Sequence, residues 1–130
     1  MDVERQIESV IRAAEAALVR GASAAEFAHL FYDESAVVIG EGWPAATRGV
    51  SELVPRLEEI FRGWGAGARL GITLVDPLLT DGSVATGFVD ATVTPSGPGA
   101  PEERYRVLYG WKRGPRGWRV MLEMFAGGST

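Results

Sequence analysis

Apolar residues recur at helical spacing in the first half of the chain and alternate with other residues in the second half. Val3, Ile7 and Ile11 share one helical face, whereas Leu70 and Ile72 are two residues apart, as in a strand. The pattern predicts helices near 2–20, 23–32 and 50–64, a short strand at 36–39, and strands near 68–79, 83–94, 103–113 and 117–126.

Residues at the element boundaries support this division. Asp2 is a plausible N-cap, and Ser23 with Glu26 forms the pattern of a capping box. The dipeptide Asp81-Gly82 predicts a hairpin turn. Pro55 lacks an N–H, so we expect the third helix to begin late or to kink. Helices that precede an antiparallel meander predict an α+β domain with its helices on one sheet face.

Composition narrows the function classes. The chain has 130 residues, which suits one domain spanning residues 1–130. It has no cysteine and a single histidine, His29, which excludes a disulfide framework and a multi-histidine metal site within one chain. The net charge of −4 and the lack of a basic stripe argue against nucleic acid, and no apolar run is long enough for a bilayer. The charged N-terminus lacks an apolar signal core, so we expect a cytoplasmic protein.

Three segments together carry a family resemblance. The segment 31–38, Phe-Tyr-Asp-Glu-Ser-Ala-Val-Val, precedes Thr47-Arg-Gly49, and the segment 118–125 closes the chain. They resemble the nuclear transport factor 2-like superfamily, which includes ketosteroid isomerase, SnoaL-like polyketide cyclases, limonene epoxide hydrolase and non-enzymatic association domains. The resemblance implies three N-terminal helices on a curved, mainly antiparallel sheet, a cone-shaped apolar pocket and frequent dimers. It does not imply one reaction, because one fold hosts many functions.

The known catalytic positions of that superfamily are mostly unmatched. When ketosteroid isomerase is aligned with this chain at Tyr32 and without gaps, its catalytic base falls on Gly40 and its helical tyrosine falls on Ala16. The second oxyanion donor falls near Tyr109, which can still donate a hydrogen bond. The arginine and aspartates of epoxide hydrolases are not recognisable. A copy of the isomerase is therefore not expected.

Strand alternation assigns the faces of the predicted sheet. Two sets share the more apolar, interior faces of their strands: Trp118, Val120, Leu122 and Met124, and Tyr105, Val107, Tyr109 and Trp111. A third interior set is Val84, Thr86, Phe88, Asp90 and Thr92, although both faces of that strand are tolerably apolar. The opposite face then carries Met121, Phe125, Leu108, Ala85, Val89, Ala91 and Val93, and Glu123 falls on it as an outer charge.

Asp90 and Tyr109 are the candidate catalytic residues. An inward Asp90 would have a pKa raised by burial and could transfer a proton, while Tyr109 could donate to an oxyanion. The alternatives are an Asp90 that faces solvent or pairs with Arg106, and a Tyr109 that is an ordinary core residue. Six further residues are candidates to line the ligand site, although a solvated loop acid or a core aromatic is the simpler interpretation of several: Glu41, Trp43, Trp64, Phe88, Trp111 and Met124.

Two functions remain open. One is a dimeric module that binds a small hydrophobic ligand in an apolar conical pocket. The alternative is an isomerase-like or SnoaL-like enzyme that performs acid–base chemistry on a small apolar carbonyl compound. Neither requires a metal or cofactor. We expect a homodimer through the outer sheet face, because the helices cannot cover both faces of the sheet. His29, near Phe27 and Leu30, is expected on the surface.

Overall fold

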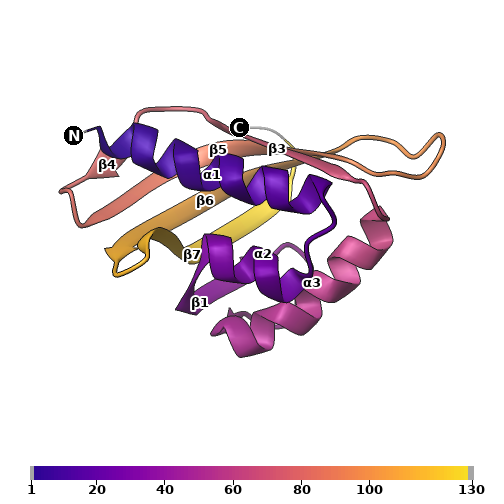
Figure 1. Ribbon diagram of the computed structural model, residues 1–130, viewed down its shortest axis with the longest axis horizontal. Helices are drawn as coiled ribbons and strands as arrows, with labels where there is room; N and C mark the ends of the chain where they lie inside the picture. The colour runs from indigo at the N-terminus through magenta and orange to yellow at the C-terminus, as the bar shows by residue number, and fades with distance from the viewer. Residues whose placement is uncertain (1, 129–130) are drawn as a thin grey trace.

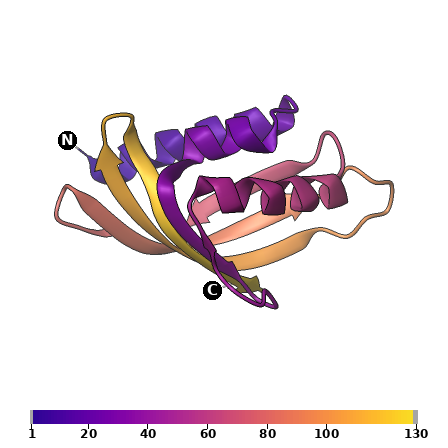
Figure 2. The ribbon, with the colours of Figure 1, turned by 90° about the horizontal axis from the view of Figure 1, so that it is seen from below.

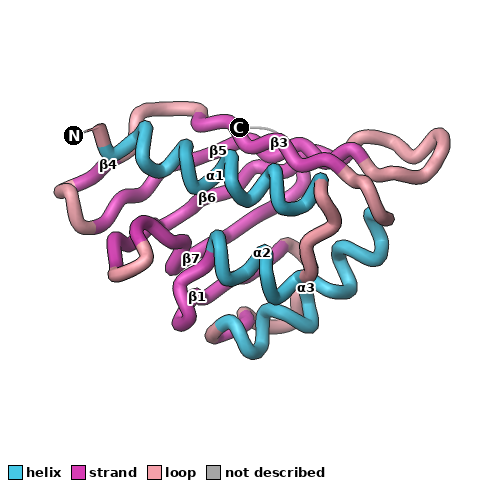
Figure 3. Tube along the Cα trace, in the orientation of Figure 1, coloured by secondary structure: helices cyan, strands magenta, loops and turns pink. Residues whose placement is uncertain are grey.

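The computed structural model describes residues 2–128 and places three helices on the concave side of a curved sheet (Figures 1 and 2). The predicted α+β class and helix-first order are confirmed, and the helices lie together over one face of the strands (Figure 3). The elements, in chain order, are α1 (Val3–Val19), α2 (Ala24–Phe31), β1 (Tyr32–Gly40), β2 (Thr47–Arg48), α3 (Val50–Trp64), β3 (Arg69–Leu74), β4 (Leu79–Thr80), β5 (Val84–Thr94), β6 (Glu103–Gly114) and β7 (Gly117–Gly127).

The sheet is mixed but mainly antiparallel. Its strand order is β2-β1-β7-β6-β5-β3, and β4 pairs with β5 beside β3. Among the strands of residues 2–128, only β1 and β7 pair in parallel, which places the first strand of the chain beside the last one. Residues far apart in the sequence therefore meet on its concave side.

The residues predicted to cap the first two helices do so in the structure, whereas two other predicted boundaries differ. Asp2 accepts hydrogen bonds from the N–H groups of Glu4 and Arg5, and the capping box at Ser23 is formed. The third helix begins at Val50 with Pro55 inside it, so the expected late start is wrong. The strand expected at 68–79 divides into β3 and β4, because the segment 75–78 contains Pro77, which has no N–H for a strand ladder.

Helix α1 also covers the free edge of β3. The Ile72 N–H donates to Glu15 Oε2 at 2.7 Å, and the Ile72 carbonyl accepts from Arg12 Nη1 at 3.2 Å. Arg12 and Glu15 pair with each other at 2.6 Å. Two side chains of one helix thus satisfy a backbone donor and acceptor at the outermost long strand.

A β-bulge in β7 changes which side chains face the core. Gly110 of β6 pairs with Leu122, whereas Trp111 pairs with Val120, so Met121 is an extra residue on β7. Trp118 and Val120 point inward as predicted. After the bulge the parity reverses, and Leu122 and Met124, which were expected inside, are exposed outside.

The predicted parity of β5 is wrong along the whole strand. Val89 and Val93 are buried on the concave face, and the exposed fraction of Phe88 is 50%. The sequence of β5 alone does not determine which of its faces points inward, because both faces carry apolar residues. The pairing with β6 determines the inward face, since Val89 lies opposite Val107 and both side chains occupy the same side of the sheet.

Candidate functional site

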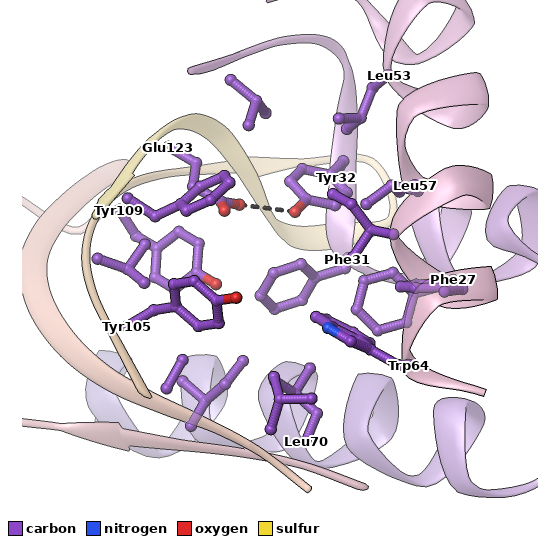
Figure 4. Close-up of a pocket in the computed structure, with 18 of the residues that line it drawn as sticks. Phe27, Phe31, Tyr32, Leu53, Leu57, Trp64, Leu70, Tyr105, Tyr109 and Glu123 are labelled. Atoms are coloured by element: carbon purple, nitrogen blue, oxygen red, sulfur yellow. Dashed lines mark hydrogen bonds between the residues drawn. The ribbon is translucent and has the colours of Figure 1, made fainter. Parts of the chain in front are cut away.

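An apolar cavity of about 320 Å³ lies between the concave sheet face and helices α2 and α3. Its walls are mostly aromatic and aliphatic, and Tyr32, Tyr109 and Glu123 form a polar side along the sheet (Figure 4). The side chains that line it are Phe27, Phe31, Tyr32, Val38, Glu41, Trp43, Leu53, Leu57, Ile60, Phe61, Trp64, Leu70, Ile72, Ala91, Val93, Tyr105, Val107, Tyr109, Glu123 and Phe125.

A buried hydrogen bond between Tyr32 and Glu123 forms the centre of the polar side. The Tyr32 hydroxyl donates to Glu123 Oε1 at 2.6 Å (Figure 4). Tyr32 is the first residue of β1, and Glu123 follows the bulge of β7, its parallel neighbour. The two residues are 91 positions apart in the sequence. Their contact depends on both the parallel pairing and the parity change at Met121.

Tyr109 adds a second hydroxyl beside the carboxyl group. It lies directly opposite Glu123 in the β6–β7 register, so both side chains occupy the same sheet face. Tyr109 lines the cavity, and its hydroxyl has no hydrogen-bond partner among residues 2–128. The Tyr109 hydroxyl oxygen is not among the fully buried side-chain atoms that lack a hydrogen bond, so it keeps some exposed surface. A molecule in the cavity can therefore reach it.

The apolar surroundings control the ionisation of this cluster. Burial raises the pKa of Glu123 from its usual 4.5 to about 7, and the hydrogen bond from Tyr32 partly opposes that rise. Burial and the neighbouring Glu123 raise the pKa of both Tyr32 and Tyr109 well above the usual value. Near neutral pH the two tyrosines are therefore donors, while Glu123 exists in both its acidic and its basic form.

Trp64, the last residue of α3, and Tyr105, on β6, line the end of the cavity next to the C-terminus of α3. Both donate to Glu103, the indole N–H of Trp64 to Oε1 at 3.3 Å and the Tyr105 hydroxyl to the same oxygen. Trp64 also stacks on Phe61 with ring centroids 5.5 Å apart. The end of α3 is thereby tied to β6 across this end of the cavity.

Glu41 and Trp43 lie on the loop after β1 and also line the cavity. Glu41 is exposed, and its Oε1 accepts from the Gly127 N–H at 3.0 Å. Trp43 meets Phe125 edge to face at 5.4 Å, and the Arg56 guanidinium lies 4.6 Å from the centre of the Trp43 ring. The carboxylate at this rim is therefore solvated, unlike Glu123.

Four of the eight candidates from the sequence line the cavity: Tyr109, Glu41, Trp43 and Trp64. Trp111 is fully buried beneath it, with its ring centroid 5.3 Å from that of Tyr109 and 5.5 Å from that of Phe31. Phe88 and Met124 lie on the opposite, exposed face. Asp90 alternates with the buried Val89 and Ala91 and does not line the cavity. The structure therefore does not bring Asp90 and Tyr109 together.

Glu123 and Tyr32 are the site residues that the sequence argument missed. Strict alternation from Trp118 placed Glu123 on the outer face. Tyr32 was used only to align the chain with ketosteroid isomerase and was not considered as a site residue. One signal could have helped: Gly110 interrupts an otherwise bulky strand, and an isolated glycine in a strand often marks a bulge. A bulge opposite Gly110, before Glu123 on the last strand, would have turned that acid inward.

Metal and membrane features were searched in the part of the chain that the structure describes. Residues 2–128 contain no group of three histidine, cysteine or acidic side chains placed to hold a metal ion. Among the same residues, no helix has both the length and the apolar character needed to cross a membrane.

Comparison with known proteins identifies the fold. No family model matches the chain, and no curated protein matches it either. Among solved structures, it is similar to an NTF2-like protein with a cystatin-like fold from Novosphingobium aromaticivorans (TM-score 0.77, 18% identity, covering 95% of this chain and 80% of that one). It is also similar to an NTF2-like protein of unknown function from Shewanella oneidensis (TM-score 0.78, 13% identity, covering 95% and 98%).

A third similar structure is a proposed dehydratase of the NTF2-like family from Streptomyces avermitilis (TM-score 0.71, 14% identity, covering 97% of this chain and 96% of that one). Likeness at such low identity concerns the backbone and not the chemistry. The chain thus has the cystatin-like fold of the nuclear transport factor 2-like proteins, as its sequence segments indicated.

The ionisation of Glu123 gives the first prediction. Carbon-13 NMR of the side-chain carboxyl should show titration near pH 7, and Tyr32→Phe should move the midpoint higher because the carboxylate loses a donor. Since the pKa in the folded state exceeds that in the unfolded state, the free energy of unfolding should fall by about 3 kcal/mol between pH 4.5 and 7. Glu123→Gln should abolish that fall, and Glu41→Gln should leave it unchanged. A midpoint below pH 5 in the wild type would contradict the prediction.

Proposed function

We propose that the chain binds a small, largely apolar molecule that carries one hydrogen-bonding oxygen. The observation that carries this proposal is the cavity of about 320 Å³ with Tyr32, Tyr109 and Glu123 together on one wall. A pocket with apolar walls and a few convergent polar groups is the usual form of a small-molecule site. Each buried methylene would contribute about 0.8 kcal/mol, so the walls set affinity and the polar side sets orientation.

The free hydroxyl of Tyr109 defines which oxygen fits. Its pKa is raised by burial, so it remains a donor at neutral pH and suits a carbonyl or ether oxygen of the ligand. Glu123 can accept from a ligand hydroxyl as a carboxylate or donate to a carbonyl as an acid. The shared feature of the accepted ligands is therefore one oxygen at the end of an apolar body.

A second candidate function is proton transfer by Glu123, and its pKa of about 7 favours it. A general base works best when its pKa lies near the working pH. The Glu123 carboxylate would remove a proton from the carbon next to a carbonyl, and the C–H electron pair would form the enolate double bond. The carbonyl π electrons would move to oxygen, where the Tyr109 hydroxyl would stabilise the negative charge. Return of a proton to the same carbon would complete a hydrogen exchange. In a β,γ-unsaturated ketone the enolate is a dienolate, and return of the proton to its γ carbon would complete an isomerisation.

Asp90 has no part in this second function, because it is absent from the cavity lining. The proposed dehydratase from Streptomyces avermitilis and a proposed ketosteroid isomerase from Parabacteroides distasonis share the backbone fold (TM-scores 0.71 and 0.65). Isomerisation of a ketosteroid and dehydration both involve proton transfer, which supports this candidate.

Binding can be tested with acetylnaphthalene, an aromatic ketone, and naphthalene, which lacks the oxygen. Fluorescence titration should show acetylnaphthalene bound about three- to tenfold more tightly, the difference expected for one net hydrogen bond. Tyr109→Phe should remove most of that preference while naphthalene affinity stays constant. Leu57→Trp should weaken both probes, because it fills the cavity. Equal binding by wild type and Leu57→Trp would count against the cavity as the site.

Proton transfer can be tested with the same ketone in deuterated water. The methyl protons next to its carbonyl should exchange faster with the protein than with buffer, as followed by proton NMR. Glu123→Gln should reduce the protein-dependent rate by on the order of 10²–10⁴. Asp90→Asn and Glu41→Gln are matched acid controls and should retain it. If binding occurs but exchange stays at the buffer rate, the second candidate fails and the binding function stands.

We also propose that the protein forms a homodimer through the outer sheet face. The apolar part of this face differs from the predicted one, because Val89, Ala91, Val93 and Phe125 point inward. In their place, a row of three aligned side chains crosses the central strands: Phe88, Leu108 and Met124. The next row sets Asp90 beside Arg106, one charge of each sign, so two copies related by a two-fold axis can complement each other.

Sedimentation equilibrium at micromolar concentration should give about twice the chain mass of 13.9 kDa. Met124→Lys should yield a monomer, because it places a charge in the apolar row. Val19→Lys is the control, since Val19 is apolar and about as exposed as Met124 but lies on α1, on the other side of the sheet from that row. A wild-type monomer would refute the dimer.

A further inference from the structure

We propose that the β6–β7 hairpin and the end of helix α2 form a site for one tetrahedral oxyanion, such as a phosphate group. The hairpin lies beside the last turn of α2, at the opposite end of the molecule from the end of α3 (Figures 1 and 2). This proposal is independent of the cavity and of its function. It concerns four cations within eight positions of an otherwise acidic chain: Lys112, Arg113, Arg116 and Arg119.

Two of these arginines converge on one oxygen atom. Arg116 Nη1 and Arg119 Nε both donate to the carbonyl of His29, the latter at 3.2 Å. Arg116 Nη1 also lies 3.3 Å from His29 Nδ1, and Arg119 Nη1 donates to the carbonyl of Trp118 at 2.8 Å. The guanidinium groups are therefore held side by side by acceptors that carry no net charge.

The local charge is not balanced by this arrangement. Within residues 2–128, neither Arg116 nor Arg119 forms an ion pair with a carboxylate. Lys112 lies directly opposite Arg119 in the strand register, which adds a third positive charge. Asp33 is the nearby acid, its pKa lowered mainly by a hydrogen bond from Ser35 and, more weakly, by Lys112 and Arg116. Asp33 is thus close to Lys112 and Arg116, and its single negative charge is smaller than the positive charge of this cluster.

Capping of the helix does not account for the second arginine. A cation near a helix C-terminus is favourable, but the helix end supplies only about −0.5 of an elementary charge. One arginine would satisfy the His29 carbonyl, and the second brings repulsion. Arg119 shows this cost: partial burial and then the neighbouring Arg116 lower its pKa. An oxyanion between the two guanidinium groups would remove the repulsion and use their remaining N–H donors.

The free donors determine the class of ligand. Two planar guanidinium groups and one flexible ammonium group present N–H bonds from different directions, which suits the several oxygens of phosphate or sulfate. A planar carboxylate has only two oxygens and can engage one arginine fully. The anion can be inorganic phosphate or the phosphate group of a larger molecule, since both offer the same oxygens.

The test measures binding of inorganic phosphate by amide chemical shifts at constant ionic strength, with chloride as the reference. Phosphate should shift the amides of His29 and of the hairpin, and acetate should bind at least several-fold more weakly. Arg116→Gln and Arg119→Gln should each weaken phosphate about tenfold, the loss expected for a charged hydrogen bond. Glutamine keeps an N–H for the His29 carbonyl, so the helix end remains capped. Arg62→Gln, an exposed arginine on α3, is the control and should change nothing.

Phenyl phosphate distinguishes the two sources of the anion. Tighter binding than inorganic phosphate would indicate a phosphate group of a larger molecule, and weaker binding would indicate the free anion; both outcomes support the site. Three results would overturn the proposal: equal shifts with phosphate and chloride, equal loss in Arg62→Gln, or full affinity in the Arg116→Gln, Arg119→Gln double variant. A thermal melt of each variant shows whether a lost response reflects unfolding.

Discussion

The single extra residue in β7 determines what the cavity contains. Without Met121 as a bulge, Leu122 and Met124 would continue the inward row that begins at Trp118, and Glu123 would face solvent. With it, a carboxyl group enters an apolar cavity opposite Tyr109 and within hydrogen-bonding distance of Tyr32. Its pKa of about 7 follows from that placement, because the same side chain on the outer face would be hydrated. The chemistry of the site therefore depends on a backbone irregularity.

The fold was accessible from the sequence because its signals are local. The caps at Asp2 and Ser23 each act within a few residues. In the Asp81-Gly82 turn, the Asp81 carboxylate accepts hydrogen bonds from the backbone N–H groups of Ser83 and Val84. Helical and alternating periodicity likewise require only neighbouring residues. The element that failed, the strand expected at 68–79, is interrupted by Pro77, a residue whose effect the periodicity alone does not include.

The site was less accessible because it depends on pairing across the sheet. The direction of β5 side chains is decided by the partner strand, since Val89 must join Val107 on the buried face. Glu123 and Tyr32 meet through a parallel pairing that no local pattern encodes. Trp43, Trp64 and Glu41 were found from aromatic and acidic character near the expected pocket, which needs no knowledge of register. Tyr109 was found from the alternation of β6, which holds in the structure, and from the family resemblance. Asp90 was misplaced because both faces of β5 carry apolar residues and the wrong one was assigned inward, whereas Glu123 was missed because the bulge at Met121 breaks the alternation of β7.

The hydrogen bonds that α1 makes to Ile72 have a consequence for how this sheet meets other chains. An edge strand with free N–H and C=O groups can recruit a further strand and grow into a fibril. Here the exposed pair of β3 is already occupied by Glu15 and Arg12, and the opposite edge, β2, is only two residues long. Both edges are thus poor templates for a further strand, so strand-by-strand growth into a fibril is disfavoured at either side of the sheet.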